Sequence, residues 1–229
     1  MRVADVMCVG AHPDDVEIGM GATVAKMVRQ GLDVVMVDLT DGEPTPHGTH
    51  ETRMAEAAEA ALVLGVAGRH TLDLRNRELA DTVEARSMLA ELIRAHAPRL
   101  LFAPYPVDAH PDHIAASAIV EAARFYSKFV KTDMSGSPHY PARLYHYFAV
   151  HLRLVAKPSF IVDVSEDIGR KGEALGSYRS QFGEQTSNRG VMDWVDGQAR
   201  QWGALIGTTA GEPFFSREEI GIRDVRDLV

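Results

Sequence analysis

The sequence predicts an α/β fold of the Rossmann-like kind, in which a mostly parallel sheet is flanked by helices on both faces and is followed by an antiparallel C-terminal extension. Three observations predict it. Short apolar runs alternate with segments of helical periodicity at least three times. Most of these runs are continuously apolar, as in strands that are covered on both faces. From about residue 134, prolines separate aromatic segments with alternating polarity.

The first half of the chain alternates strand and helix. The predicted strands are at 6–9, 34–39, 70–74 and 100–103, and the predicted helices are at 18–28, 51–64, 82–96 and 115–129. Gly31, Gly65 and Pro98 supply the signals that end the first three helices. Ligands of such folds bind beyond the carboxyl ends of the strands, so functional residues are expected in the loops that follow them.

The second half is predicted to be less regular. Segments 143–151 and 159–164 are interpreted as antiparallel or edge strands, segments 165–180 and 190–205 as helices, and the stretch from Gly211 as irregular. Since there is no internal repeat and no linker, we expect a single domain that spans residues 1–229.

Charge and cysteine content exclude several classes of protein. The chain has 24 Lys and Arg residues against 32 Asp and Glu residues, a formal net charge of −8, and no dense basic run. Nucleic acid and anionic membranes are therefore poor partners. The single cysteine, Cys8, cannot form an internal disulfide, and the first residues lack the pattern of a signal peptide. Together with the lack of a long apolar run, these features predict a cytoplasmic protein.

The chemistry is expected in two loops that follow the first and fourth predicted strands, Ala11–Asp15 and His110–His113. A single His-Pro-Asp sequence is typical of a turn. Two of them at neighbouring strand ends crowd three imidazoles with three carboxylates, an arrangement that is costly without a cation. His12, Asp15 and His113 form a set of two histidines and one carboxylate that suits Zn²⁺, with Fe²⁺ as the alternative.

The remaining residues of these loops suit hydrolysis. Asp14, next to a ligand, is the candidate general base. His110, held protonated by Asp112, is the candidate that stabilises the oxyanion and protonates the leaving amine. By contrast His47 and His50 lie in a polar loop without rigid support, and we interpret them as exposed or lid residues. Gly19 and Gly21 come too late in the first helix for a dinucleotide-binding turn.

The two motifs resemble the paired signatures of the LmbE-like, PIG-L-type zinc-dependent de-N-acetylases. Further stretches resemble the bacillithiol-biosynthesis branch of that family: residues 40–46, 131–134, 158–163 and 211–215. The resemblance implies that N-acetylglucosaminyl malate is hydrolysed to glucosaminyl malate and acetate, with Zn²⁺ on His12, Asp15 and His113 and with Asp14 as general base. It also implies a small-molecule N-acetylglucosaminide substrate and a homo-oligomer, with a hexamer as one form.

The same resemblance implies a set of residues that bind substrate. Arg53 matches an arginine that reaches substrate hydroxyl or carboxylate groups, and Tyr140 and Asp108 replace an arginine and a tyrosine of some relatives. Loop placement adds Glu43, Asn188 and Arg189. The alternatives are a bacillithiol-conjugate amidase or a chitooligosaccharide deacetylase on the same metal centre and, more remotely, a non-haem iron oxygenase or an inactive sugar-binding protein.

Overall fold

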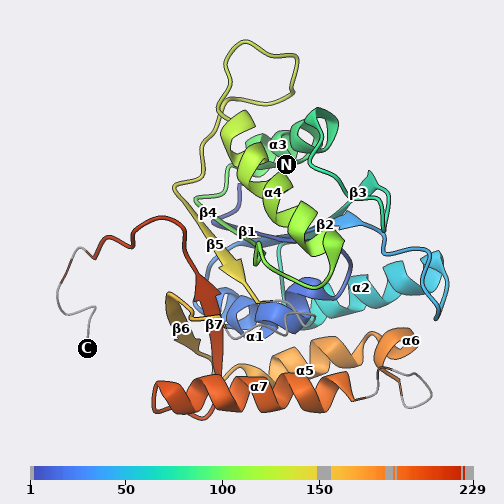
Figure 1. Ribbon diagram of the computed structural model, residues 1–229, viewed down its shortest axis with the longest axis vertical. Helices are drawn as coiled ribbons and strands as arrows, with labels where there is room; N and C mark the ends of the chain where they lie inside the picture. The colour runs from blue at the N-terminus through green and yellow to red at the C-terminus, as the bar shows by residue number, and fades with distance from the viewer. Residues whose placement is uncertain (1–2, 149–155, 184–187, 189, 223, 225–229) are drawn as a thin grey trace.

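The computed structural model describes residues 3–148, 156–183, 188, 190–222 and 224. The strands are β1 (Val6–Gly10), β2 (Val34–Thr40), β3 (Gly68–Leu74), β4 (Leu100–Pro104), β5 (Arg143–Tyr147), β6 (Phe160–Asp163) and β7 (Gly211–Phe215). The helices are α1 (Asp15–Arg29), α2 (His50–Leu64), α3 (Val83–His96), α4 (Pro111–Tyr126), α5 (Ile168–Gly176), α6 (Arg179–Phe182) and α7 (Val191–Leu205). The strands form one sheet in the order β3-β2-β1-β4-β5-β7-β6, with helices on both faces, which confirms the predicted α/β fold (Figure 1).

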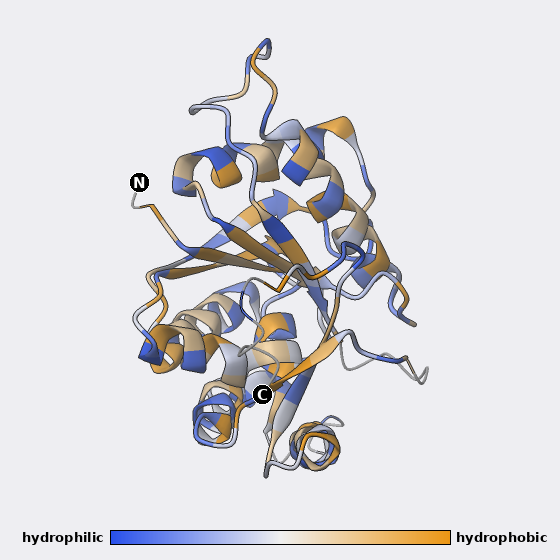
Figure 2. Cartoon of the chain, turned by 90° about the vertical axis from the view of Figure 1, so that its left-hand side faces the viewer, coloured by the Kyte–Doolittle hydropathy of each residue, from blue (hydrophilic) through white to orange (hydrophobic). Residues whose placement is uncertain are grey.

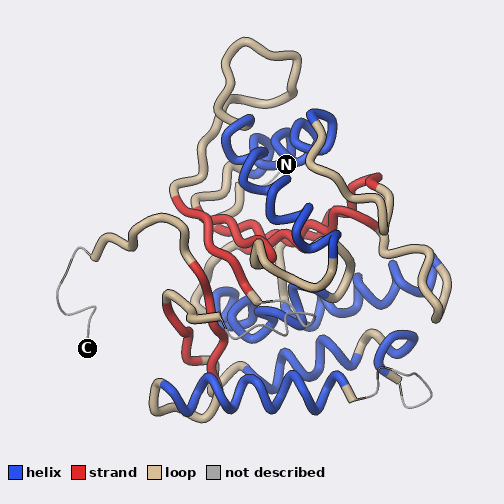
Figure 3. Tube along the Cα trace, viewed as in Figure 1, coloured by secondary structure: helices blue, strands red, loops and turns tan. Residues whose placement is uncertain are grey.

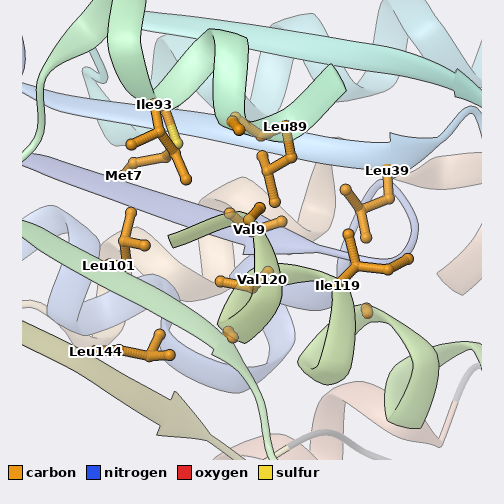
Figure 4. Packing of buried hydrophobic residues seen from close by; sticks show 14 of the residues in the cluster. Met7, Val9, Leu39, Leu89, Ile93, Leu101, Ile119, Val120 and Leu144 are labelled. Atoms are coloured by element: carbon orange, nitrogen blue, oxygen red, sulfur yellow. The ribbon is translucent and has the colours of Figure 1, made fainter. Parts of the chain in front are cut away.

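Alternate residues of each central strand enter two separate hydrophobic layers. Met7 and Val9 of β1 pack with residues of α3 and α4 such as Leu89 and Ile119 (Figure 4). On the opposite face, Cys8 packs with residues of α1 and α2. Figure 2 shows the apolar sheet between its helical layers. Burial on both faces explains why these strands have continuous apolar sequences instead of alternating ones.

Local signals in the sequence fix where the helices begin and end. The side chains of Thr49 and Thr82 accept hydrogen bonds from backbone N–H groups of the first turns of α2 and α3. Gly65 ends α2 at φ 75°, a left-handed conformation that favours glycine. The side chain of His110 caps α4, and Pro111 takes the first helical position, so His113 lies in the first turn.

The topology places the two predicted loops on either side of one crevice. β1 and β4 are parallel neighbours, but α1 leads from β1 to β2 while α4 leads from β4 to β5 on the other side. At such a switch point the two loops separate and leave a crevice at the carboxyl edge of the sheet. The fold therefore brings the loop at 11–15 and the loop at 108–113 together across 100 residues of sequence.

Two predictions for the second half differ from the structure. β5 was expected to be antiparallel or at an edge; it is antiparallel to β7, but it lies inside the sheet and runs parallel to β4, with Leu100 beside Arg143 and Pro104 beside Tyr147. The stretch from Gly211 was expected to be irregular, but it forms β7, antiparallel to both β5 and β6. Five residues that include Pro213 carry no alternation, and only the pairing with distant strands makes them a strand. Part of the predicted strand at 143–151 lies outside the described residues.

The glycines of α1 allow close packing against neighbouring side chains. A Cβ atom on Gly19 would lie 2.2 Å from Cδ2 of Tyr147, whose hydroxyl donates to Val9 O at 3.0 Å. Near Met20, where φ and ψ are not helical, the carboxylate of Glu212 on β7 accepts from the N–H groups of Ala22 and Thr23. The antiparallel extension thus supports the helix that begins at Asp15.

Among the described helices, none has the length and apolarity that a membrane crossing requires.

Candidate metal centre and active site

The three predicted metal ligands lie together at the crevice. His12 and Asp15 belong to the loop between β1 and α1, and His113 belongs to the first turn of α4. Each can offer a ligand atom within 4.8 Å of the other two, and all three residues are buried. A second group of residues, His12, His110 and Asp112, meets the same distance criterion. The two groups share His12, so the crevice concentrates donor atoms around that imidazole.

Backbone amides hold the carboxylate of Asp15 in place. Asp15 Oδ2 accepts hydrogen bonds from the N–H groups of Ala11 and His12, both at 2.9 Å. The other oxygen, Oδ1, lies 3.2 Å from His113 Nε2. Gly10 favours this close turn, because a Cβ atom there would lie 3.1 Å from both Asp15 Cβ and His12 O, a tight contact. Oδ1 therefore faces His113, while Oδ2 accepts the backbone amides and lies 3.4 Å from His12 Nδ1.

Two further carboxylates orient the histidines. Asp112 Oδ2 lies 3.1 Å from His12 Nε2, and Asp108 Oδ2 lies 2.9 Å from His113 Nδ1. These contacts leave His12 Nδ1 and His113 Nε2 facing Asp15. A carboxylate on the far nitrogen is the usual second partner of a metal-binding histidine, because it fixes the tautomer and the ring orientation. The donor set therefore fits a divalent cation.

The electrostatics of the crevice also favour a cation. Burial lowers the pKa of His113, but Asp15 and Asp108 outweigh it and raise the pKa to about 10. Burial likewise opposes the charged form of His12, while Asp15 and Asp112 raise its pKa to about 9. The carboxylates therefore stabilise positive charge at the same nitrogens that a metal ion would use.

Asp14 lies next to this set in a constrained conformation. It is the residue before α1 and has φ 103°, a left-handed value that Asp tolerates better than most residues. Arg53 Nη2 donates to Asp14 Oδ2 at 2.9 Å and also to the carbonyl of Pro13. Burial raises the pKa of Asp14 to about 7, although Arg53 acts in the opposite direction. Arg53, only 4% exposed, is thus a partner of the predicted base as well as a lining residue.

Asp112 and His110 are arranged differently from the predicted pair. The carboxylate of Asp112 contacts His12 and accepts the N–H of Arg77 at 2.7 Å. Its link to His110 is through the backbone, since the N–H of Asp112 donates to His110 Nδ1 at 3.2 Å. An Nδ1 atom that accepts this bond carries no proton, so His110 would present Nε2 to a ligand. Asp108, which the sequence analysis named only as a departure from relatives, contacts His113 Nδ1 and so orients that imidazole. The sequence indicated this role only by placing Asp108 five residues before His113.

A cavity of about 270 Å³ lies over these groups and is lined by His12, Asp14, Asp15, Arg53, Arg77, His110, His113 and Asn188, among others. Asn188 and Arg53 thus lie where the sequence placed them. Glu43 instead lines a neighbouring cavity.

Tyr140 is not at this pocket. It lies in the loop before β5, at the amino edge of the sheet, and its ring stacks with Arg124. The prediction that Tyr140 contacts substrate is therefore wrong within one chain, because α4 leads the chain from the carboxyl edge of the sheet to its amino edge before Tyr140. Arg189 lies outside the described residues.

The two histidines that we excluded as ligands are apart from the described metal-binding groups. His50 begins α2, and its Nδ1 lies 2.9 Å from Asp41 Oδ2 with the side chain 55% exposed. His47 contributes its backbone oxygen to Thr45 and Gln181. Neither imidazole belongs to a cluster of three possible ligands among the described residues.

Comparison with known proteins agrees with this site. Residues 7–124 match the PIG-L family, described as GlcNAc-PI de-N-acetylase. The chain is 33% identical over 196 residues to a diacetylchitobiose deacetylase of Thermococcus kodakarensis, with 80% of this chain and 72% of that protein covered. It is 31% identical to a 1D-myo-inositol 2-acetamido-2-deoxy-alpha-D-glucopyranoside deacetylase of Nocardiopsis dassonvillei, with 75% and 69% covered. The crystal structure of a conserved protein of Thermus thermophilus superposes with a TM-score of 0.90 at 36% identity, covering 97% of this chain and 99% of that one.

Proposed function

This chain belongs to the PIG-L family and is a de-N-acetylase, and we propose that it removes the acetyl group from a small molecule that contains N-acetylglucosamine. The observation that carries the proposal is the buried group of His12, Asp15 and His113 with Asp14 beside it, under a cavity of about 270 Å³. That volume is near the lower end for small-molecule pockets and suits one sugar unit.

The metal would be held by His12 Nδ1, one oxygen of Asp15 and His113 Nε2, and we propose Zn²⁺, with Fe²⁺ as the alternative. A divalent ion at this position would polarise the amide carbonyl and lower the pKa of water. Asp108 and Asp112 would keep the two imidazoles in the ligand orientation.

The residues around the metal can carry out amide hydrolysis. Asp14 would accept a proton from the attacking water as the water oxygen bonds to the carbonyl carbon, and Arg53 would hold that carboxylate in place. His110 would donate a hydrogen bond from Nε2 to the oxygen that gains negative charge, and the proton taken up by Asp14 would pass to the nitrogen as the C–N bond breaks. Acetate and a free amine leave the site, and the proton that water released ends on the amine.

Asp14→Asn tests the assignment of the base. The amide keeps the size of the carboxylate and can still accept from Arg53, but it cannot take a proton. We expect acetate release to fall by about 10²–10⁴-fold, while the metal content of the purified protein stays the same. Turnover at the wild-type rate would remove Asp14 from this role, and loss of metal would assign it to the ligand set.

The substrate is tested by comparing acetate release from three N-acetylglucosamine compounds: the free sugar, N-acetylglucosaminyl malate and diacetylchitobiose. The resemblance to bacillithiol-biosynthesis enzymes favours the malate glycoside, and the similarity to a diacetylchitobiose deacetylase favours the disaccharide. A bacillithiol conjugate serves as the fourth compound, for the amidase alternative. If none of the four releases acetate or amine from protein loaded with Zn²⁺ or Fe²⁺, the proposed function is wrong.

A further inference from the structure

A second cavity adjoins the one over the metal centre. It has a volume of about 480 Å³, against about 270 Å³ for the first, and the two share Pro44 and Asn76 as lining residues. Its walls come from the loop after β2, the start of α2, the end of β3 and the loop that follows it; these loops are drawn in tan in Figure 3. A molecule larger than one sugar could extend from the first cavity into the second.

The boundary between the cavities is a fixed part of the site. The side-chain amide of Asn76 donates to Gly42 O at 2.6 Å and to Pro44 O at 3.4 Å, which joins the loop after β3 to the loop after β2. The next residue, Arg77, donates its N–H to Asp112, and Asp112 contacts His12. The wall of the second cavity is therefore connected through three hydrogen bonds to a candidate metal ligand.

Acidic side chains dominate the second cavity. Its described lining includes the carboxylates of Asp41, Glu43, Asp73 and Glu78 against one guanidinium, Arg75. Arg75 lies 3.7 Å from Glu78. His50, also in the lining, contacts Asp41. A dicarboxylate placed here would meet like charges, whereas hydroxyl and amine groups would find hydrogen-bond acceptors.

The described linings of the two cavities together hold three arginines, Arg53, Arg75 and Arg77, against six carboxylates, so acidic charge prevails. Arg53, which the sequence suggested as a partner for a substrate carboxylate, already donates to Asp14 and Pro13. We propose that the second cavity binds the group attached to the acetylated sugar, and that this group is a second hexopyranose, neutral or amine-bearing, instead of a dicarboxylic acid. The inference rests on the proposed function and narrows its substrate class.

The test compares kcat/KM for N-acetylglucosamine, diacetylchitobiose and N-acetylglucosaminyl malate in the wild type and in Asp73→Lys/Glu78→Lys. Both positions are exposed and outside the catalytic machinery, so the variant should fold. In the wild type the disaccharide is expected to exceed the malate glycoside by about tenfold or more. In the variant, kcat/KM for the malate glycoside should be about tenfold higher than in the wild type, and kcat/KM for the free sugar should stay within about twofold. Most of the increase for the malate glycoside should disappear in 1 M salt, where the screening length is about 3 Å.

A matched control is Asp133→Lys/Glu219→Lys, which changes the net charge equally at exposed positions that line neither cavity. It should leave the ratio of the two glycosides unchanged. The inference is overturned if the wild type prefers the malate glycoside, if the ratio does not move in the cavity variant, or if the control moves it equally. If acetate is released from the free sugar but the kcat/KM ratio of the two glycosides is the same in the wild type and the cavity variant, only this inference is overturned. If no compound releases acetate, the proposed function is overturned as well.

Discussion

Two groups of buried charges differ in how they are balanced. Around His12, Asp15 and His113, the carboxylates of Asp15, Asp108 and Asp112 contact imidazoles and backbone amides. Elsewhere in the protein, buried carboxylates contact cations supplied by the chain: Arg69 contacts both Glu17 and Asp38, and Lys171 contacts Glu212. Carboxylates that contact imidazoles stabilise positive charge on nitrogens that a metal ion can also use, whereas carboxylates paired with Lys or Arg are neutralised within the fold.

The balanced group has a structural function. Glu212 holds the N–H groups of Ala22 and Thr23 where α1 departs from helical geometry, and Lys171 Nζ neutralises it at 2.7 Å. Removing a charge should therefore have different consequences in the two regions. At the candidate metal centre it should change metal binding and activity, and at Glu212 it should change stability with little effect on metal binding.

The largest expected effect comes from Asp15→Asn. The amide oxygen can keep the bonds from Ala11 and His12, but an NH₂ group would then face His113 Nε2 in place of a ligand oxygen. We expect metal affinity and acetate release to fall by about a thousandfold or more, and the metal-free protein to unfold at a lower denaturant concentration at about pH 7, because Asp15 raises the pKa of both imidazoles. Metal analysis and denaturant unfolding measure both. Retention of tightly bound metal would remove Asp15 from the ligand set.

Lys171→Met is expected to have the next largest effect, and on stability. Lys171 is 4% exposed, so its loss leaves the carboxylate of Glu212 buried without a counter-ion. The free energy of unfolding should fall by about 3–5 kcal/mol, as measured with denaturant on the metal-free protein. The matched control is Lys171→Met/Glu212→Gln, which should recover a large part of the loss. A change below about 1 kcal/mol would contradict the comparison, as would a lower metal content per folded molecule.

Asp108→Asn should have a smaller effect. Its carboxylate orients His113 without being a ligand, so the variant should bind metal about 10–100-fold more weakly, as measured by competition with a chelator. At saturating metal, much of the activity should return, which separates positioning from ligation. Asp133→Asn, at an exposed site, is the control and should bind metal as the wild type does. If the affinity of Asp108→Asn matches that control, Asp108 has no part in holding His113.

The sequence predicted the parallel half of the fold and the grouping of His12, Asp15 and His113, because both depend on local patterns. Buried strands need continuous apolar runs, and the loops with His12 and His113 follow two of them. β7 was missed because only its pairing with β5 and β6 makes Gly211–Phe215 a strand. The contacts of Asp108 and Asp112 were missed for a related reason: which carboxylate meets which imidazole depends on side-chain geometry across the crevice, and spacing alone does not determine it.

The smallest expected effect is that of Tyr140→Ala, and it tests the boundary of the functional region. Tyr140 is 46% exposed and lies against Arg124 and Lys128, at the amino edge of the sheet and away from the metal centre. Within one chain it cannot reach a substrate held over His12, so kcat/KM should stay within about twofold of the wild type, and stability should change by about 0.5 kcal/mol or less. A larger fall in kcat/KM at unchanged stability would mean that Tyr140 reaches the site of another protomer. The active site would then be built by an oligomer, and the charge comparison would have to include residues of the neighbouring chain.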